Sequence, residues 1–254
     1  MEKDTKIKII ILAAGKGKRM RSELPKALIP LGGKPMIRYI LDKIETLPFG
    51  IPHIVVGHNK EKIIKDLGDT YNYVVQEEQL GTGHAVNVVK TYIKDGAESI
   101  VILYGDQPFT SAETIEKLVE KQKRTKAKIV MATVKVPNFD DWRANFLGFS
   151  KVIRDHNGKI IRTVEKKDST EEENKIKEVN PCYFCFDSKW LWSHLEKLKN
   201  DNAQKEYYLT DLIKMVTEEG IEIESIEIDA KEALGANTKE ELEILENILR
   251  NKNS

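Results

Sequence analysis

The stretch ILAAGKGKRMRSELPKALIPLGGKP, residues 11–35, joins an apolar run to a turn made of small and cationic residues. Ala13, Ala14, Gly15 and Gly17 have little or no side chain, so their backbone N–H groups allow a phosphate chain to approach closely. Five cations accompany them, namely Lys16, Lys18, Arg19, Arg21 and Lys26. Because the run directly follows an expected strand, we interpret it as a phosphate-binding loop rather than an ordinary solvated basic loop.

The spacing within this stretch excludes two common phosphate loops. A dinucleotide-binding G-x-G-x-x-G would need glycine where the chain has Met20. A P-loop would need Ser or Thr after Gly33 and Lys34, where Pro35 stands. The stretch therefore predicts a third kind of nucleotide loop.

Length and composition restrict the class of protein. The 254 residues are enough for one large α/β domain with a substantial core. Lysine plus arginine equals aspartate plus glutamate, 41 each, so net charge does not favour nucleic acid or an acidic membrane as partner. The sequence shows no run near the ~18 apolar residues of a membrane span, and residues 1–6 are mostly charged. We expect a cytoplasmic protein.

Apolar runs alternate with helical patterns through the first half of the chain. Strands are expected at residues 8–12, 53–56, 73–76, 100–104 and 128–134, and helices at residues 35–47, 60–67, 83–94 and 111–124. This alternation predicts an α/β fold with a doubly wound, mostly parallel sheet. Ligands of such sheets bind at the carboxyl ends of the strands, where the loop of residues 11–35 would meet the end of the strand at residues 100–104.

The second half predicts a small hairpin and closing helices. Asn157-Gly158 is a strong hairpin turn between strands at residues 152–154 and 160–165, which we interpret as a lid or subdomain over the sheet edge. The charged segment of residues 166–177 is expected to be solvated. Further strands are expected at residues 179–186 and 221–228, and helices near residues 188–198, 209–219 and 239–251.

Cys182 and Cys185 form a C-x-x-C within the strand expected at residues 179–186. Side chains three apart on a strand point to opposite faces, so the two thiols would diverge. A structural zinc site would also need two more ligands, and the sequence has no second pair of cysteines. We expect two buried, neutral cysteines.

Two short segments at expected strand ends carry candidate chemistry. Asp106 follows an apolar strand and Gly105, and a carboxylate in that position suits Mg²⁺, with a turn or helix-cap role as the alternative. Gly81-Thr82-Gly83 at a helix start can present backbone amides to a base or phosphate. The alternative is a purely structural role as a tight turn with a Thr cap. Gln76 and Gln79 can hydrogen-bond a nucleobase edge.

Taken together, these residues resemble the sugar-phosphate nucleotidyltransferases, and among them the N-acetylglucosamine-1-phosphate uridylyltransferases. The signature L-A-A-G-x-G-x-R-M-x-S-x-x-P-K stands at residues 12–26, E-Q-L-G-T-G-H-A at 78–85 and L-Y-G-D at 103–106. V-E-x-K-D stands at residues 164–168, N-A-Q-x-E-Y-Y-x-T-D at 202–211 and G-x-N at 235–237. The matches occur in family order and cover nearly the whole chain.

The resemblance implies a role for each matching position. A nucleotide would be held by Leu12, Ala13, Ala14 and Gly15 through backbone, by Lys26, and at a pyrimidine base by Gln76, Gly81 and Thr82. Arg19, Lys26 and Asp106 would be catalytic, with Asp106 and Asn237 as ligands of a Mg²⁺ cofactor. The sugar would contact Tyr104, Gly105, Ser150, Glu165 and Asn180.

The same resemblance implies a Rossmann-like nucleotidyltransferase fold and a reaction. Residues 1–254 would form one domain, with a nucleotide-binding half at about 1–136 and a sugar-binding half with closing helices at about 137–254. The substrates would be small molecules, an NTP such as UTP and a sugar-1-phosphate such as N-acetylglucosamine-1-phosphate. The attacking phosphate oxygen is already an anion, so the site must supply positioning and charge neutralisation rather than an activated nucleophile. His84 is then a packing or hydrogen-bonding residue.

The chain departs from the family pattern around the expected sugar. Y-G-R of the family is Phe149-Ser150-Lys151 here, and N-x-G is Asn180-Pro181-Cys182. These changes leave another sugar-1-phosphate open, and the base-reading loop does not decide between UTP and dTTP. A non-catalytic sugar-nucleotide-binding subunit is the alternative of a different class. The sequence after Glu240 does not resemble hexapeptide β-helix repeats, so we expect no acetyltransferase activity; the oligomeric state stays open.

Overall fold

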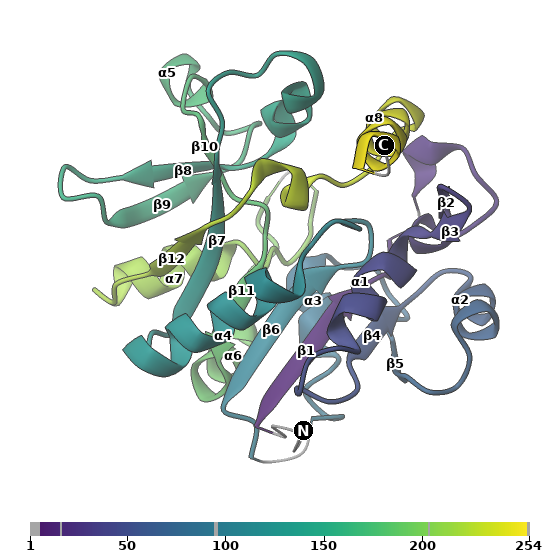
Figure 1. Ribbon diagram of the computed structural model, residues 1–254. Coiled ribbons are helices and arrows are strands. Elements are labelled where there is room, and N and C mark those ends of the chain that lie inside the picture. The colour runs from purple at the N-terminus through teal and green to yellow at the C-terminus, as the bar shows by residue number, and fades with distance from the viewer. Residues whose placement is uncertain (1–5, 16, 94–95, 203, 253–254) are drawn as a thin grey trace.

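The computed structural model describes residues 6–15, 17–93, 96–202 and 204–252. Its main feature is a mixed, mostly parallel sheet in the order β5-β4-β1-β6-β11-β7-β10-β8-β9, with β12 paired to β7 (Figure 1). The strands of this sheet are β1 (Ile7–Leu12), β4 (His53–Val56), β5 (Asn72–Val75), β6 (Ser99–Tyr104), β7 (Ile129–Lys135), β8 (Lys151–Arg154), β9 (Ile160–Val164), β10 (Glu178–Val179), β11 (Phe184–Asp187) and β12 (Glu224–Glu227).

Helices and short 3-10 turns connect the strands. The α-helices are α1 (Met36–Ile44), α2 (Lys60–Leu67), α3 (Thr82–Asn87), α4 (Ala112–Thr125), α5 (Glu171–Asn174), α6 (Ser188–Leu195), α7 (Asp211–Glu218) and α8 (Lys239–Lys252). The 3-10 turns are η1 (Lys18–Met20), η2 (Lys26–Leu28), η3 (Asp141–Gly148) and η4 (Ala230–Ala233). The bounds of β4 and α2 agree residue for residue with those expected from the sequence.

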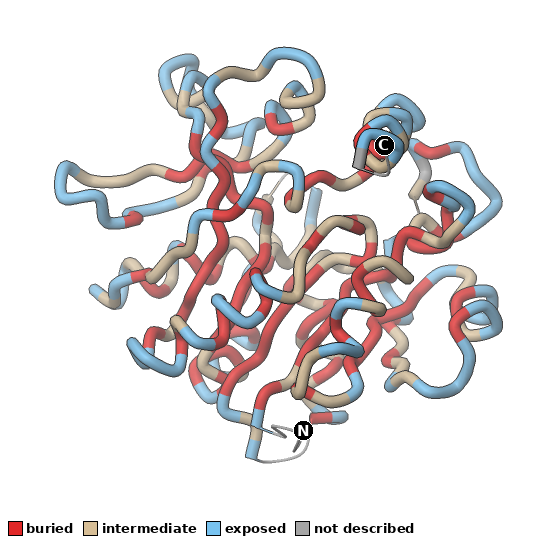
Figure 2. Tube along the Cα trace, viewed as in Figure 1, coloured by how far each residue is buried: buried red, intermediate tan, exposed pale blue. Residues whose placement is uncertain are grey.

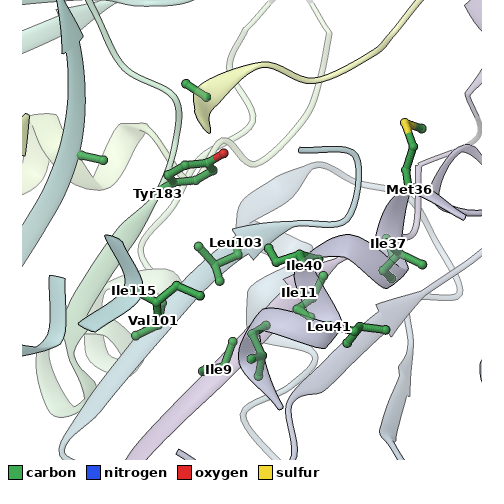
Figure 3. Packing of buried hydrophobic residues seen from close by; sticks show 14 of the residues in the cluster. Ile9, Ile11, Met36, Ile37, Ile40, Leu41, Val101, Leu103, Ile115 and Tyr183 are labelled. Carbon is green, nitrogen blue, oxygen red and sulfur yellow. The ribbon is translucent and has the colours of Figure 1, made fainter. Parts of the chain in front are cut away.

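The alternation of side chains along β1 explains why helices cover both faces of the sheet. Ile9 and Ile11 belong to one buried cluster, together with apolar side chains of α1 and α4 (Figure 3). Ile10 and Leu12 belong to a second cluster, with side chains of α3, α6 and α7. The central strands β1, β4, β6, β7 and β11 are accordingly buried along the middle of the molecule (Figure 2). This confirms the doubly wound α/β fold.

The pairing register brings several chain segments to one edge of the sheet. Leu12 pairs with Val55 on β4 and with Tyr104 on β6, so these parallel strands end together. Strand β11 runs antiparallel to β6, which places residues 180–183, just before it, at that same edge. Strand β12 runs parallel to β7, and the chain after it continues to residues 228–237. One sheet edge thus collects segments from the whole chain.

The hairpin predicted by Asn157-Gly158 is present as β8 and β9, with Gly158 at φ +81° in its turn. It joins the main sheet through β10, because Val179 pairs with Lys151. A second, unexpected hairpin forms a separate small sheet from β2 (Pro30–Leu31) and β3 (Lys34–Pro35). Helix α8 packs beside it (Figure 1), and an added Cβ at Gly32 would meet Leu249 at 2.6 Å.

Two expected elements are wrong in extent. The strand expected at residues 179–186 is split into β10 and β11, because Pro181 has no backbone N–H and Cys182 has φ +66°. The helix expected at residues 83–94 is shorter in the structure, because α3 ends at Asn87. The chain continues as turns with hydrogen bonds between residues three apart, such as Val89 N–H to Val86 O. In the described residues, no helix is both long and apolar enough to cross a membrane.

Candidate active site

A cavity of about 450 Å³ opens at the sheet edge where β1 and β6 end. We call it the first cavity. It is lined by residues of the loop that follows β1, which we call the β1 loop, of the loop between β5 and α3, and of the end of β6. Its lining residues are Leu12, Ala13, Ala14, Gly15, Lys26, Ala27, Gln76, Gln79, Gly81, Thr82, Ala85, Tyr104, Gly105, Asp106 and Glu206.

The β1 loop is fixed by backbone hydrogen bonds and close packing. The N–H of Ala13 donates to Val55 O at 2.9 Å, and that of Gly105 donates to Leu12 O at 3.0 Å. Gly17 has φ +58°, and an added Cβ there would lie 3.0 Å from Lys26 Cβ. Only glycine combines this conformation with such close contact. Lys16, expected among the loop cations, lies outside the described residues, as does the side chain of Lys18.

Lys26 is the electrostatic centre of the cavity. Its ammonium forms an ion pair with Asp106 Oδ2 and donates to Asn237 Oδ1 at 2.7 Å. Arg19 Nη2 donates to the same Asn237 oxygen at 3.2 Å. The side chains of Lys26 and Asp106 are only 14% and 22% exposed, so this charge pair is weakly screened. The structure therefore brings together the two cations and the two metal ligands that the family resemblance implies, namely Arg19, Lys26, Asp106 and Asn237.

The loop that carries Asn237 is held tightly against Asp106. The N–H of Ala236 donates to Asp106 O at 3.3 Å, and an added Cβ at Gly235 would lie 2.8 Å from that oxygen. The N–H of Asn237 donates to the Glu241 carboxylate in the first turn of α8. The close approach requires glycine at position 235 and places Asn237 beside β6.

The oxygen donors at this point fit Mg²⁺. The Asp106 carboxylate and the Asn237 amide oxygen converge on one cation, the Lys26 ammonium. No group of three or more His, Cys, Asp or Glu side chains with metal-binding geometry occurs in the described part of the chain. Mg²⁺ commonly takes one or two protein oxygens and completes its octahedron with phosphates and water. Asp106 and Asn237 match that ligand number and type.

The loop before α3 forms the other side of the first cavity. Gln76 is buried, and its Nε2 donates to Gly81 O at 3.1 Å and lies 3.0 Å from His84 Nδ1. Both N–H groups of this amide are thereby used, so its oxygen is the atom left to accept from a ligand. His84 acts as a hydrogen-bonding residue, in agreement with the sequence interpretation.

Residues 207–209 hold this loop in place by hydrogen bonds and close contacts, an arrangement that we call the clamp. The N–H of Tyr207 donates to Leu80 O at 2.7 Å, and the N–H of Gly83 donates to Tyr207 O at 2.8 Å. An added Cβ at Gly81, which has φ +107°, would lie 2.6 Å from Tyr207 O. The Thr82 hydroxyl accepts from the N–H of Leu209 at 3.0 Å. The clamp also brings Glu206 into the cavity lining, a residue inside the motif at 202–211 to which the sequence assigned no role.

A second cavity of about 200 Å³ adjoins the first and shares Tyr104 and Asp106 with it. The split between β10 and β11 and the hairpin strand β8 bring its walls together. Ser150 Oγ donates to Glu165 Oε1 at 2.7 Å, and the N–H of Asn180 donates to Ser150 O at 2.9 Å. Its lining residues are Tyr104, Asp106, Gln107, Gly148, Phe149, Ser150, Glu165, Asn180, Pro181 and Cys182.

Cys182 corrects the expectation of two buried cysteines on one strand. Cys185 is buried in β11, but Cys182 is partly exposed, lies between strands and borders the second cavity. The Asn180 side chain accepts from the Cys182 N–H at 2.8 Å and so stabilises this turn. Burial raises the pKa of both thiols and of the Tyr104 hydroxyl, so all three groups are neutral at physiological pH.

Most of the predicted site residues line one or both cavities, whereas Arg19 and Asn237 line neither. The expected nucleotide residues all line the first cavity, and Ser150, Glu165 and Asn180 line the second. Tyr104 borders both, whereas Gly105, expected beside the sugar, borders the first cavity. Gln107, which the sequence interpretation missed, lines the second cavity directly after Asp106. Its position next to the L-Y-G-D motif was the available signal.

The model of the MobA-like NTP transferase domain matches residues 9–214. The chain belongs to this family. The bifunctional protein GlmU of Caldicellulosiruptor saccharolyticus is 40% identical over 244 residues, which cover 95% of this chain and 51% of the relative. GlmU of Idiomarina loihiensis is 39% identical over 249 residues, covering 97% and 52%. The chain thus spans about half the length of these curated relatives.

Two solved structures share the fold of this chain. A Bacillus anthracis protein, provisionally described as a glucose-1-phosphate thymidylyltransferase, superimposes with a TM-score of 0.75 at 22% identity over 96% of this chain and 95% of that chain. The inositol-1-phosphate CTP transferase of T. maritima gives a TM-score of 0.70 at 17% identity over 98% of both chains. At these identities the likeness concerns the fold alone.

Proposed function

We propose that this NTP transferase moves a uridylyl group from UTP to N-acetylglucosamine-1-phosphate in a Mg²⁺-dependent reaction, giving UDP-N-acetylglucosamine and pyrophosphate. One observation carries the proposal: two adjoining cavities share Asp106, and Lys26 pairs with that residue. A nucleotide in the first cavity and a sugar phosphate in the second would meet at this point.

The first cavity suits a uracil or thymine base. The Gln76 nitrogen is used within the protein, which leaves the amide oxygen as an acceptor. Uracil and thymine carry an N–H donor at ring position 3, whereas cytosine carries an acceptor there. The proposal of UTP or dTTP over CTP rests on this difference, and UTP is proposed because the sequence motifs resemble those of the N-acetylglucosamine-1-phosphate uridylyltransferases.

The phosphate chemistry needs charge neutralisation and alignment. A phosphate oxygen of the sugar-1-phosphate attacks the α-phosphorus of UTP, a new P–O bond forms, and the bond to the β-phosphate breaks to release pyrophosphate. Lys26 and Arg19 would turn from Asn237 to the phosphate oxygens and stabilise the charge that develops there. The small residues Ala13, Ala14 and Gly15 would let the triphosphate lie against backbone N–H groups.

Asp106 and Asn237 would hold Mg²⁺, which supplies positive charge beside the reacting phosphates. In the second cavity, Glu165 would accept from the sugar, since Ser150 and Thr210 approach only one of its two oxygens, at 2.7 and 3.4 Å. The other oxygen of that carboxylate would then hydrogen-bond an uncharged sugar.

Pyrophosphate release tests the proposal. The reaction contains Mg²⁺, UTP and N-acetylglucosamine-1-phosphate, with parallel reactions on glucose-1-phosphate, on dTTP and without metal. We expect release with UTP and the acetylated sugar, and none without Mg²⁺. Release only with glucose-1-phosphate or dTTP would keep the reaction class and overturn the substrate assignment. Tight binding of UDP-N-acetylglucosamine without any release would overturn the enzymatic proposal and favour a binding subunit.

A further inference from the structure

Gln107 is a buried side chain whose hydrogen bonding is incomplete. It follows Asp106 directly and borders the second cavity, at 7% exposure. Its Nε2 donates to Pro181 O at 3.0 Å and to Ala233 O at 3.4 Å, so both N–H groups of the amide are used. Its Oε1 is buried and has no hydrogen-bond partner among the described residues.

Asn180 shows the opposite pattern on the same cavity. It is 1% exposed, and its Oδ1 accepts from the N–H of Cys182 at 2.8 Å. The oxygen is thereby fixed, and the amide nitrogen Nδ2 is buried without a partner within the part of the chain that is described. Two residues that line the second cavity therefore carry a buried unsatisfied polar atom each, an acceptor on Gln107 and a donor on Asn180.

Buried polar atoms are nearly always hydrogen-bonded, so each exception calls for a reason. The two others in the described residues, His53 Nδ1 and Asn145 Nδ2, belong to residues that do not line this cavity. Gln107 and Asn180 are both anchored by the other half of their amide, which rules out relief by a simple amide flip. The two atoms left over are one acceptor and one donor, which is the complement of a group that both donates and accepts.

We propose that Gln107 is a specificity-determining residue that acts with Asn180 on one sugar group. Gln107 Oε1 accepts a hydrogen bond from that group, and Asn180 Nδ2 donates one to it. A ring hydroxyl and an acetamido group both have this donor and acceptor character. The inference rests on the proposed function and adds a residue that none of the sequence motifs assigned.

Gln107 also links the segments that carry Asn180 and Asn237, because its two acceptors belong to residues 181 and 233. A test must therefore separate substrate contact from mere support of the fold. Gln122 provides a matched control. It is buried at 5% exposure in α4, its Oε1 accepts from Ser99 Oγ at 2.7 Å, and its Nε2 donates to Ala127 O at 3.3 Å.

The experiment compares Gln107→Met with Gln122→Met in steady-state kinetics and thermal unfolding. We expect Gln107→Met to raise the KM for the sugar-1-phosphate about 10-fold or more while the KM for UTP stays within about twofold. Gln122→Met should lower the melting temperature and leave both KM values unchanged. If Gln107→Met does not fold, Gln107→Asn, one methylene shorter, is tested against the same expectations. Equal effects on both substrates, or none, would overturn the inference.

Two further arms make the result decisive. With N-acetylglucosamine-1-phosphate and glucose-1-phosphate compared, a loss confined to the acetylated sugar identifies the acetamido group, and an equal loss identifies a hydroxyl. Calorimetric binding of the sugar phosphate beside a non-hydrolysable UTP analogue does not depend on turnover. Wild-type binding without pyrophosphate release would overturn the proposed function, while a 10-fold weaker binding by Gln107→Met would still support the inference. Wild-type protein that binds no sugar phosphate would overturn both.

Discussion

The two cavities are lined by different kinds of chemical groups. The first is bordered largely by small residues and backbone, with Ala13, Ala14, Gly15 and Gly81 among its walls. The second is bordered by polar side chains such as Ser150, Glu165, Asn180 and Gln107. A backbone wall hardly changes its chemistry when a residue is replaced, whereas a side-chain wall changes with each substitution. We therefore expect changes at the shared centre to abolish the reaction and changes in the second cavity to redirect it.

The largest effect is expected at Asp106, the residue common to both cavities. Asp106→Ala removes the carboxylate that pairs with Lys26 and would hold the metal, and should lower kcat/KM by at least about 10³-fold. Initial rates of pyrophosphate release measure this. Asp42→Ala is the control, because Asp42 also pairs with a lysine, Lys34, but lies on α1. Near-normal activity of Asp106→Ala would show that the cavities do not meet in a reaction centre.

The next largest effect is expected at Lys26. Lys26→Ala removes a cation for the phosphates and should lower kcat/KM by about 10²-fold. Because the ammonium no longer occupies the oxygens of Asp106 and Asn237, Mn²⁺ should bind the free variant more tightly than the wild type. Calorimetry with Mn²⁺ measures this, with Lys34→Ala as control. Unchanged Mn²⁺ affinity would contradict the shared position of the ammonium and the metal.

A smaller change, in selectivity rather than rate, is expected at Cys182. Cys182 borders the second cavity and has a left-handed backbone conformation that glycine adopts without strain. Cys182→Gly should therefore enlarge the cavity without straining the backbone. The ratio of kcat/KM for N-acetylglucosamine-1-phosphate to that for glucose-1-phosphate should rise about 10-fold. Cys185→Ala, in the core of β11, should leave the ratio unchanged. A constant ratio in Cys182→Gly would remove this residue from substrate selection.

The smallest effect on turnover is expected at Lys151, which affects stability instead. Burial, with a contribution from Lys166, lowers the pKa of this fully buried lysine from 10.5 to about 8. Between pH 8 and 10.5 the unfolded chain thus binds more protons at this site than the folded one, so the free energy of unfolding should rise with pH. Denaturant unfolding at pH 8 and 10 tests this against Lys151→Met. The same rise in the variant would assign it to other groups.

The sequence predicted the parallel half of the fold well, because strands such as β4 are short apolar runs with clear breaks before and after them. It missed the split between β10 and β11, since Asn180, Pro181 and Cys182 interrupt a run that is otherwise apolar. The two-residue strands β2 and β3 are too short to leave a periodic pattern. The local pattern of apolar and polar residues therefore predicts the regular strands and helices. It does not predict the places where a single turn changes the direction of the chain.

The first cavity could likewise be predicted from the sequence, whereas the second could not. The residues of the first cavity lie on contiguous motifs at strand ends, so their proximity could be predicted from the parallel sheet. The second cavity depends on the antiparallel pairing of β11 and on the contacts of Gln107 with residues 181 and 233. Such long-range contacts leave no local pattern in the chain. The roles of the individual residues in both cavities stay predictions.

The most direct test of the central claim is a crystal structure with UDP-N-acetylglucosamine and Mg²⁺. We expect uracil in the first cavity beside Gln76, the sugar in the second cavity between Glu165 and Gln107, and the diphosphate beside Asp106 with Lys26 turned toward it. A sugar bound in the first cavity, or a diphosphate far from Asp106, would contradict the division of the site into a backbone-built nucleotide cavity and a side-chain-built sugar cavity.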